Sequence, residues 1–140
     1  MGRLLAIDYG LKRTGLAVSD SMRIIASALD TVDTAQLLTY LKKYFDREAV
    51  DEVVIGMPKK LNNQDSEIAP AVRLFIAEFQ KQFPNKPITP WDERFTSALA
   101  QQAMISGGMK KKDRQVKGNV DKISATLILQ NYMEFKGPIR

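Results

Sequence analysis

The chain contains no cysteine and no histidine among its 140 residues. Without these side chains there can be no disulfide framework, thiolate nucleophile or imidazole general base, and no ordinary zinc, haem or iron–sulfur site. Any chemistry must therefore run on carboxylates, hydroxyls and amines. If a metal takes part, we expect Mg²⁺ or Mn²⁺, because carboxylate and carbonyl oxygens are the suitable ligands that remain.

The sequence also lacks any long apolar run. No segment approaches the roughly 20 residues needed to span a membrane, and the first apolar run, Leu4–Ile7, stops at Asp8. Hydrophobic residues make up 44% of the chain and charged residues 26%, which are ordinary values for globular proteins. We therefore expect a single domain over residues 1–140, with no signal peptide and no membrane association, acting in the cytoplasm.

The net charge of +5 is concentrated in one segment. From Lys110 to Lys117 five basic residues accompany a single aspartate, so this segment alone carries a net charge of +4. Such a surplus favours a nucleic-acid partner, whose phosphates would be bound by Lys110, Lys111, Lys112, Arg114 and Lys117, with Lys59 and Lys60 extending the same surface. The alternative interpretation is a solvated flexible loop, which is what charge runs usually are.

Hydrophobic periodicity predicts an α/β fold. The expected elements in chain order are strands over 4–7, 15–18 and 24–28, a helix over about 34–45, a strand over 53–55, a helix capped by Ser66 and ending near Phe83, a strand over 88–92, and helices over about 96–106 and 121–135. The basic segment 109–120 has no periodic pattern and is expected to be irregular. This order predicts a sheet with an antiparallel first half followed by parallel crossovers.

Asp8 is the first candidate for a chemical role. It ends a buried strand and is followed at once by a glycine turn, so its carboxylate should lie at the end of the sheet. Gly10 and Gly15 enclose Lys12 and Arg13 in a tight basic hairpin, which would let a phosphate backbone come close to the carboxylate. The alternative is a turn aspartate that accepts hydrogen bonds from nearby backbone N–H groups.

Two further acidic positions follow later in the chain. Asp92, Glu93 and Arg94 end the last predicted strand, and because adjacent strand residues point to opposite faces, only one of the two carboxylates can join a common site. Asp121 begins the last predicted helix, directly after the basic segment, and its alternative interpretation is a helix N-cap. Trp91 could stack on a base, although core packing is the favoured interpretation.

Three converging carboxylates would repel one another, and a divalent metal removes that repulsion. Two ions about 3.5 to 4 Å apart, held by aspartate and glutamate, can support in-line phosphodiester hydrolysis without histidine or cysteine. The absence of cysteine and histidine and the placement of the carboxylates therefore both point to a divalent-metal site with oxygen ligands.

Four motifs follow one another along the chain. They are Asp8, Gly10, Arg13, Gly15 and Ala17, then Gly56 and Pro58, then Asp92-Glu93-Arg94 with Thr96-Ser97, and finally Val120-Asp121 with Ile128-Leu129-Gln130 and Tyr132. Together these motifs resemble the YqgF (RuvX) family over the whole chain. This resemblance implies an RNase H-like fold, with a mixed five-stranded sheet and helices on both faces. It implies a nuclease described as a Holliday junction resolvase, or as one acting on the precursor of small-subunit ribosomal RNA.

Carried over residue by residue, the family's acidic positions are Asp8, Glu93 and Asp121. We expect them to be catalytic and to hold Mg²⁺ or Mn²⁺, with Arg94 joining the residues that bind the substrate. The chain departs from the general RNase H-like pattern in one respect, because the predicted strand beside the first ends in Gly56-Met57-Pro58 and carries no carboxylate. The second metal ligand must then come from the strand beyond, about 9.6 Å away over two inter-strand steps, where Glu93 reaches further than Asp92.

Two other classes of function remain open on the residues alone. The chain could be a non-catalytic nucleic-acid-binding module, such as a ribosome-assembly factor, whose acidic residues hold no metal. The hairpin after Asp8 also suggests a phosphotransferase of the actin-like kind. This interpretation is disfavoured, because such enzymes close two domains around a nucleotide and 140 residues supply only one domain. Junction cleavage would need two coordinated cuts, and therefore predicts a homodimer.

Overall fold

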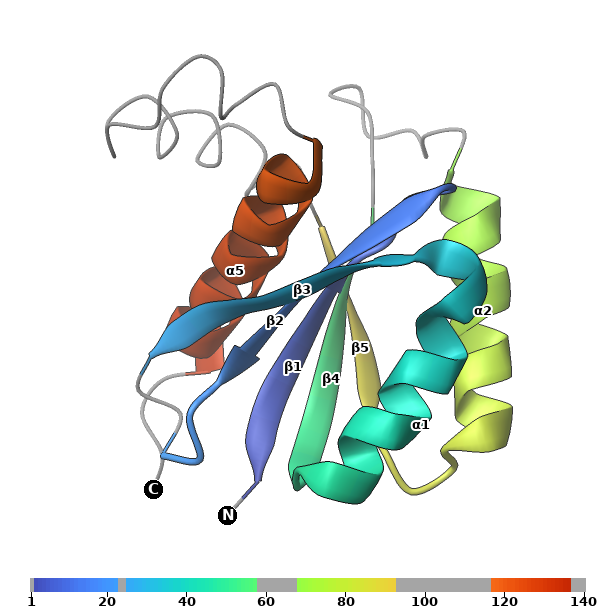
Figure 1. The fold of residues 1–140 in the computed structure, drawn as a ribbon. Helices are drawn as coiled ribbons and strands as arrows, with labels where there is room; N and C mark the ends of the chain where they lie inside the picture. The colour runs from blue at the N-terminus through green and yellow to red at the C-terminus, as the bar shows by residue number, and fades with distance from the viewer. Residues whose placement is uncertain (1, 23–24, 58–67, 93–116, 137–140) are drawn as a thin grey trace.

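The computed structural model describes residues 2–22, 25–57, 68–92 and 117–136, without the side chains of Asp92 and of residues 117–123 and 134–136. Its elements are β1 (Arg3–Asp8), β2 (Arg13–Ser19), β3 (Ala26–Asp33), the 3₁₀ turn η1 (Thr34–Gln36), α1 (Leu37–Arg47), β4 (Val50–Met57), α2 (Ala69–Gln82), β5 (Ile88–Asp92) and α5 (Lys117–Lys136) (Figure 1). None of the helices in this described part is long and apolar enough to cross a membrane.

The strands form one sheet in the order β3-β2-β1-β4-β5. The β1–β2 and β2–β3 pairs are antiparallel, and the β1–β4 and β4–β5 pairs are parallel. This is the predicted mixed sheet, with an antiparallel first half and parallel crossovers after it. Because β1 is the middle strand, its carboxyl end lies at the centre of one sheet edge.

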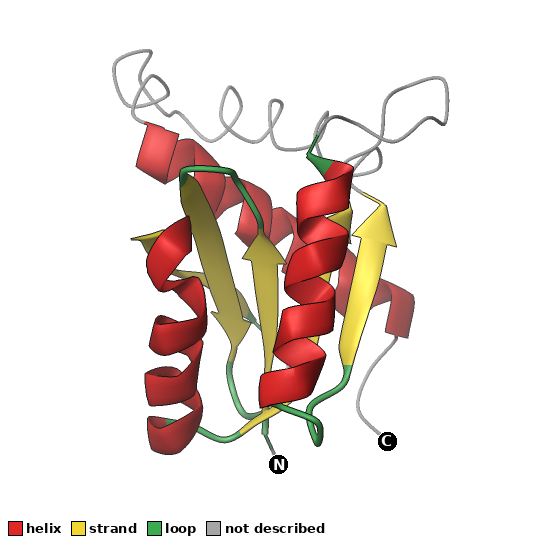
Figure 2. Ribbon diagram, turned by 90° about the vertical axis from the view of Figure 1, so that its right-hand side faces the viewer, coloured by secondary structure: helices red, strands yellow, loops and turns green. Residues whose placement is uncertain are grey.

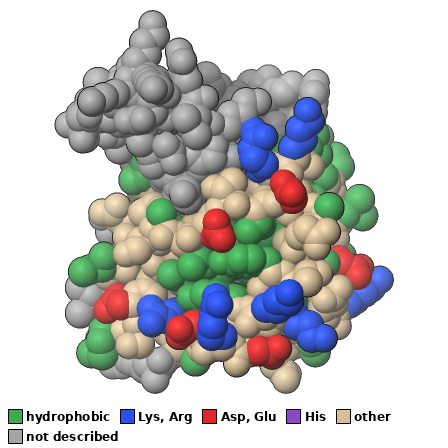
Figure 3. Space-filling model, viewed as in Figure 1, with side chains coloured by type: hydrophobic (Ala, Val, Ile, Leu, Met, Phe, Trp, Pro, Cys, Tyr) green, Lys and Arg blue, Asp and Glu red, His purple; other side chains and the backbone are tan. Residues whose placement is uncertain are grey.

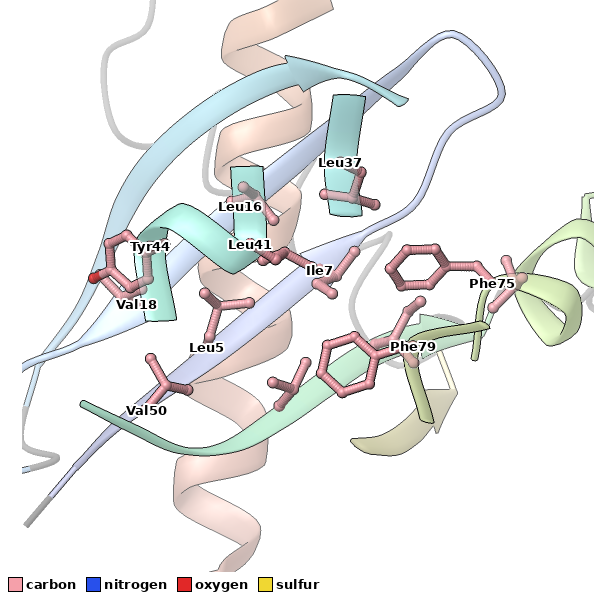
Figure 4. Close-up of a cluster of buried hydrophobic side chains, with 13 residues drawn as sticks. Leu5, Ile7, Leu16, Val18, Leu37, Leu41, Tyr44, Val50, Phe75 and Phe79 are labelled. Atoms are coloured by element: carbon pink, nitrogen blue, oxygen red, sulfur yellow. The ribbon is translucent and has the colours of Figure 1, made fainter. Parts of the chain in front are cut away.

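Each face of the sheet is covered by helices, with α1 and α2 on one face and α5 on the other (Figure 2). The alternation of β1 sends Leu5 and Ile7 toward α1 and α2, where they pack with Leu41 and Phe79 (Figure 4). Leu4 and Ala6 face α5 instead, where they pack with its buried residues Ala125, Ile128, Leu129 and Tyr132. Both faces of β1 are therefore buried, as expected for a central strand in an α/β sheet.

Several predicted boundaries are wrong; the strand predicted over 53–55, for example, runs over Val50–Met57. The third strand runs over Ala26–Asp33 rather than 24–28, because pairing with β2 continues through Asp30, Thr31 and Asp33. The predicted helix over 34–45 begins as the 3₁₀ turn η1 and becomes α-helical only at Leu37. The last helix begins at Lys117 instead of Asp121, so the predicted irregular segment is helical over 117–120. The predicted helix over 96–106 lies outside the described residues. The prediction that Ser66 caps the second helix is wrong, because α2 begins at Ala69 and its N-cap residue is Ile68.

Among the residues that the structure describes, Phe79 of α2 is the largest fully buried side chain. Its ring centroid lies 5.0 Å from that of Phe83 and 6.2 Å from those of Phe45 and Phe75. We expect Phe79→Ala to lower the free energy of unfolding by about 3–5 kcal/mol, measured by urea denaturation. Leu74→Ala on the same helix is the control, because Leu74 is 73% exposed and should change stability by no more than about 0.5 kcal/mol. Equal effects of the two changes would contradict this packing.

Candidate active site

Asp8 ends the central strand β1 on the face that α5 covers. The alternation that turns Leu4 and Ala6 toward α5 assigns Asp8 to the same face. Asp8 is half-buried, so its carboxylate stands at the boundary between the core and solvent. The prediction that this residue lies at the end of the sheet is confirmed.

Glycines flank Asp8 on both neighbouring strands. Gly15 of β2 lies directly opposite Asp8, and Gly56 of β4 follows Ile55, the partner of Ile7. Gly15 alternates with Ala17 and Gly56 with Val54, both of which face α5, so both glycines lie on the face of Asp8. The two strands beside Asp8 therefore contribute only backbone at this level, as strands often do where a ligand approaches closely.

Asp121 is the fifth residue of α5, which begins at Lys117. It therefore lies inside the helix, and the interpretation of Asp121 as an N-cap is wrong. It precedes Ala125 by one helical turn and shares the helical row of Ala125, Ile128 and Tyr132, the row that is buried against the sheet. The hydroxyl group of Tyr132 donates a 2.7 Å hydrogen bond to Glu52 Oε1, near the amino end of β4. This contact agrees with the direction of α5, whose first turns lie at the end of the sheet where β1 ends, on the side of the β1–β2 hairpin (Figures 1 and 2).

The end of β5 completes this edge. Trp91 pairs with Gly56 and Asp92 pairs with Met57, so β5 ends level with β4. The Trp91 ring lies 5.7 Å from the Tyr132 ring in an edge-to-face contact, which confirms core packing as the interpretation of this tryptophan. Glu93, the next residue, lies outside the described residues, so the choice between Asp92 and Glu93 stays a prediction.

The β1–β2 hairpin carries Lys12 and Arg13 beside this edge. Lys12 is exposed and Arg13, the first residue of β2, is half-buried. Tyr9, the first hairpin residue, packs on Phe75 of α2 at 5.3 Å between ring centroids. A Cβ atom on Gly10 would collide with the carbonyl oxygen of Arg13, so the hairpin requires glycine at that position.

Most of the other predicted phosphate-binding residues lie outside the described residues, namely Lys59, Arg94, Lys110, Lys111, Lys112 and Arg114. Lys117 is placed by its backbone at the first residue of α5. On the described part of the face in Figure 3, lysine and arginine side chains are interspersed with aspartate and glutamate. This distribution agrees with a charge excess concentrated in the segment from Lys110 to Lys117.

Among the described side chains, no three acidic residues gather into a metal site. Of the three predicted ligands, Asp8 alone belongs to that set, because the side chains of Glu93 and Asp121 lie outside it. What the sequence reasoning missed is the support around Asp8. The alignment of Gly15 and Gly56 beside it follows from strand register, and a hydroxyl pair, Thr14 and Thr34, holds the hairpin from residues 20 positions apart.

The fold matches solved structures over almost its full length. T. thermophilus RuvC in complex with Holliday junction substrate superimposes with a TM-score of 0.55 at 15% identity, covering 99% of this chain and 98% of that one. A structure of Thermus thermophilus RuvC gives a TM-score of 0.51 at 14% identity, covering 98% and 99%. The predicted RNase H-like fold is therefore confirmed, and the protein is an RNase H-like α/β protein with an aspartate ending its central strand.

The profile of the RuvX family, described as Holliday junction resolvase, matches residues 2–135. The chain belongs to this family, as its motifs predicted. A Phocaeicola vulgatus protein named "Putative pre-16S rRNA nuclease" is 54% identical over 136 residues, covering 97% of this chain and 98% of that protein. A Bacteroides fragilis protein of the same name is 51% identical over 136 residues, covering 97% and 99%. The protein is thus a hydrolase of the nuclease class, acting on phosphodiester bonds.

Proposed function

We propose that the protein is a metal-dependent endonuclease whose site is formed by Asp8, Asp121 and Glu93. The observation that carries the proposal is the location of two acidic positions at the same edge of the sheet. Asp8 ends the central strand on the α5 face, and position 121 lies in the sheet-facing row of α5 near its start, at the same edge. Glu93 follows directly after β5, which ends there as well.

The residues around Asp8 fit a hard divalent cation. The donors are carboxylate oxygens, which Mg²⁺ and Mn²⁺ prefer, and the chain has no thiolate or imidazole that would favour a softer metal. Gly15 and Gly56 contribute only backbone directly beside Asp8 on the two neighbouring strands, which leaves room there for a ligand of its carboxylate. When bound, the cation would favour deprotonation of a water molecule and offset the charge on the departing oxygen.

The protein's own groups orient the substrate. Lys12 and Arg13 in the hairpin beside Asp8 would bind phosphates, and Lys59, Arg94, Lys110, Lys111, Lys112, Arg114 and Lys117 would extend that contact along the nucleic acid. With the phosphates held on both sides of the scissile bond, the carboxylates stay directed at one phosphorus. This division separates residues that govern affinity from residues that govern the rate of cleavage.

The substrate we propose is structured nucleic acid in the cytoplasm. The names of the 54% and 51% identical relatives favour pre-16S rRNA, for which we propose processing of the 5′ end, and the family description favours a Holliday junction. A junction has two symmetric cut sites, so action on it requires a homodimer on the DNA. The mass of the complex in solution, measured on a four-way junction and on a precursor rRNA fragment, separates the two substrates.

Calorimetry with Mn²⁺ tests the metal site directly. We expect the wild-type protein to bind Mn²⁺, and Asp8→Asn to weaken that binding by at least about tenfold because it removes a charged oxygen ligand. Asp46→Asn is the matched control, since Asp46 is an exposed aspartate on α1, in the layer opposite α5, and should bind Mn²⁺ like the wild type. If Asp8→Asn bound Mn²⁺ as tightly as the wild type, the result would favour the non-catalytic binding module instead.

A further inference from the structure

The hairpin between β1 and β2 is held by a ring of hydrogen bonds through two threonine hydroxyl groups. The backbone N–H of Gly10 donates to Thr14 Oγ1 at 3.5 Å, and Thr34 Oγ1 donates to the carbonyl oxygen of Gly10 at 2.5 Å. The two hydroxyl oxygens lie 2.9 Å apart. A fourth bond runs from the backbone N–H of Thr34 to the carbonyl oxygen of Lys12, at 3.0 Å.

The direction of every bond in this ring is determined. A hydroxyl group has one hydrogen, and that of Thr34 is donated to Gly10, so the hydrogen between the two oxygens must come from Thr14. Each hydroxyl then donates once and accepts once, and the chain of bonds begins and ends on the two peptide groups that flank the Gly10 Cα atom. Thr14 is fully buried, so water cannot replace a lost member of the ring without cost.

The ring lies on the other side of the sheet from Asp8. Thr14 alternates with Leu16 and Val18, which face α1 and α2, and Thr34 begins η1, directly after the edge strand β3. Changing either threonine therefore leaves the carboxylate and its flanking glycines unaltered. What changes is the anchoring of Gly10 and Lys12, and with it the placement of the basic residues that follow Gly10.

We propose that Thr34 is a positioning residue, whose hydroxyl and backbone N–H groups hold the β1–β2 hairpin so that Lys12 and Arg13 are presented to phosphate. The inference rests on the proposed function in one respect, the binding of phosphate by this hairpin. Its structural part, the anchoring of Gly10 by a residue 24 positions away, follows from the hydrogen bonds alone.

The binding test compares Thr34→Val, which removes the hydroxyl at nearly constant shape, with Thr34→Ser, which keeps it. The probe is a fluorescein-labelled four-way DNA junction in EDTA, titrated at several salt concentrations. We expect Thr34→Val to weaken binding about five- to tenfold and Thr34→Ser to stay within about twofold of the wild type. The salt slope of Thr34→Val should become shallower, toward that of the Lys12→Ala/Arg13→Ala variant. In that double-variant background Thr34→Val should have no further effect on binding.

Amide hydrogen exchange at Gly10 tests the anchoring without nucleic acid. Exchange should be about tenfold faster in Thr34→Val than in the wild type or Thr34→Ser, while amides in the middle of β4 stay unchanged. Thr34→Ala replaces Thr34→Val in both tests if the latter unfolds at the assay temperature.

The two tests address different parts of the inference, so their results can overturn those parts separately. Unchanged exchange at Gly10 in a folded variant that lacks the hydroxyl overturns the inference. Faster exchange with unaltered junction binding, while Lys12→Ala/Arg13→Ala weakens binding, overturns the presentation of the basic residues to phosphate by Thr34. If Lys12→Ala/Arg13→Ala leaves binding and its salt slope unchanged, phosphate binding by the hairpin is wrong, and the exchange result still decides the anchoring.

Discussion

Asp8→Asn is expected to lower the rate of cleavage by about 10³-fold or more while leaving the protein folded and bound to nucleic acid. The magnitude follows from removing one charged group that acts on the reacting phosphate, where charge develops in a site with little water. Asparagine has nearly the same shape as aspartate, and Asp8 is only half-buried at the end of β1, so the sheet should form unchanged. Loss of a negative charge beside the phosphates should leave affinity equal or slightly higher.

The measurement is single-turnover cleavage of a four-way DNA junction and a pre-16S rRNA fragment, assayed side by side with Mg²⁺. Asp46→Asn carries the same chemical change on an exposed position of α1 and should cleave like the wild type. Cleavage at the same rate in Asp8→Asn would contradict the proposed mechanism. The site acts on the substrate that the wild type and Asp46→Asn cut and Asp8→Asn does not.

The core strands were predictable because burial imposes a pattern on them. Leu4, Leu5, Ala6 and Ile7 form a continuous apolar run, which a strand buried on both faces requires. The edge strand β3 was predicted too short because its second half contains Asp30, Thr31 and Asp33, which read as a polar loop. Pairing with β2 outweighs the weak strand propensity of the two aspartates, and no local pattern reports that pairing.

The start of α5 was misplaced by local signals. Gly118 and the preceding basic run read as a loop, and Asp121 reads as a helix cap, yet α5 begins at Lys117. Glycine lowers helix propensity by about 1 kcal/mol, a cost that burial of the row of Ala125, Ile128 and Tyr132 against the sheet offsets once the helix has formed. The error made a position in the sheet-facing row of α5 look like a helix cap.

The residues of the candidate site also differ in whether a local sequence pattern could reveal them. Asp8 could be found from sequence, since a carboxylate that ends a buried strand before a glycine turn is a local pattern. The glycines beside it could not be assigned their role, because Gly15 and Gly56 reach the level of Asp8 through the register of β2 and β4. Thr14 and Thr34 were not detectable for the same reason, as the contact between their hydroxyl groups joins distant segments.

The affinity for nucleic acid is expected to depend far more on the basic segment from Lys110 to Lys117 than on the net charge of the protein. Replacing Lys110, Lys111 and Lys112 by alanine should remove up to three phosphate contacts, which makes the slope of log K against log salt shallower by about 2 to 3. At about 0.15 M salt, this corresponds to binding that is weaker by about 100-fold. The measurement is fluorescence anisotropy of a labelled junction or rRNA fragment across a salt series in EDTA, so that cleavage does not contribute.

The matched control removes three positive charges from the other layer of the molecule. Lys42 and Lys43 on α1 and Lys81 on α2 are exposed lysines on the face opposite α5, and replacing them by alanine also lowers the net charge from +5 to +2. If nucleic acid is held at the edge where Asp8 lies, the control should change affinity by less than about threefold, because screening limits the effect of charges more than about 8–10 Å from the phosphates. Equal losses in the two variants would mean that nonspecific charge governs affinity. Because the slope counts the phosphate contacts that a variant loses, it reports whether the lysines before α5 touch the backbone of the nucleic acid that Asp8 is proposed to cut.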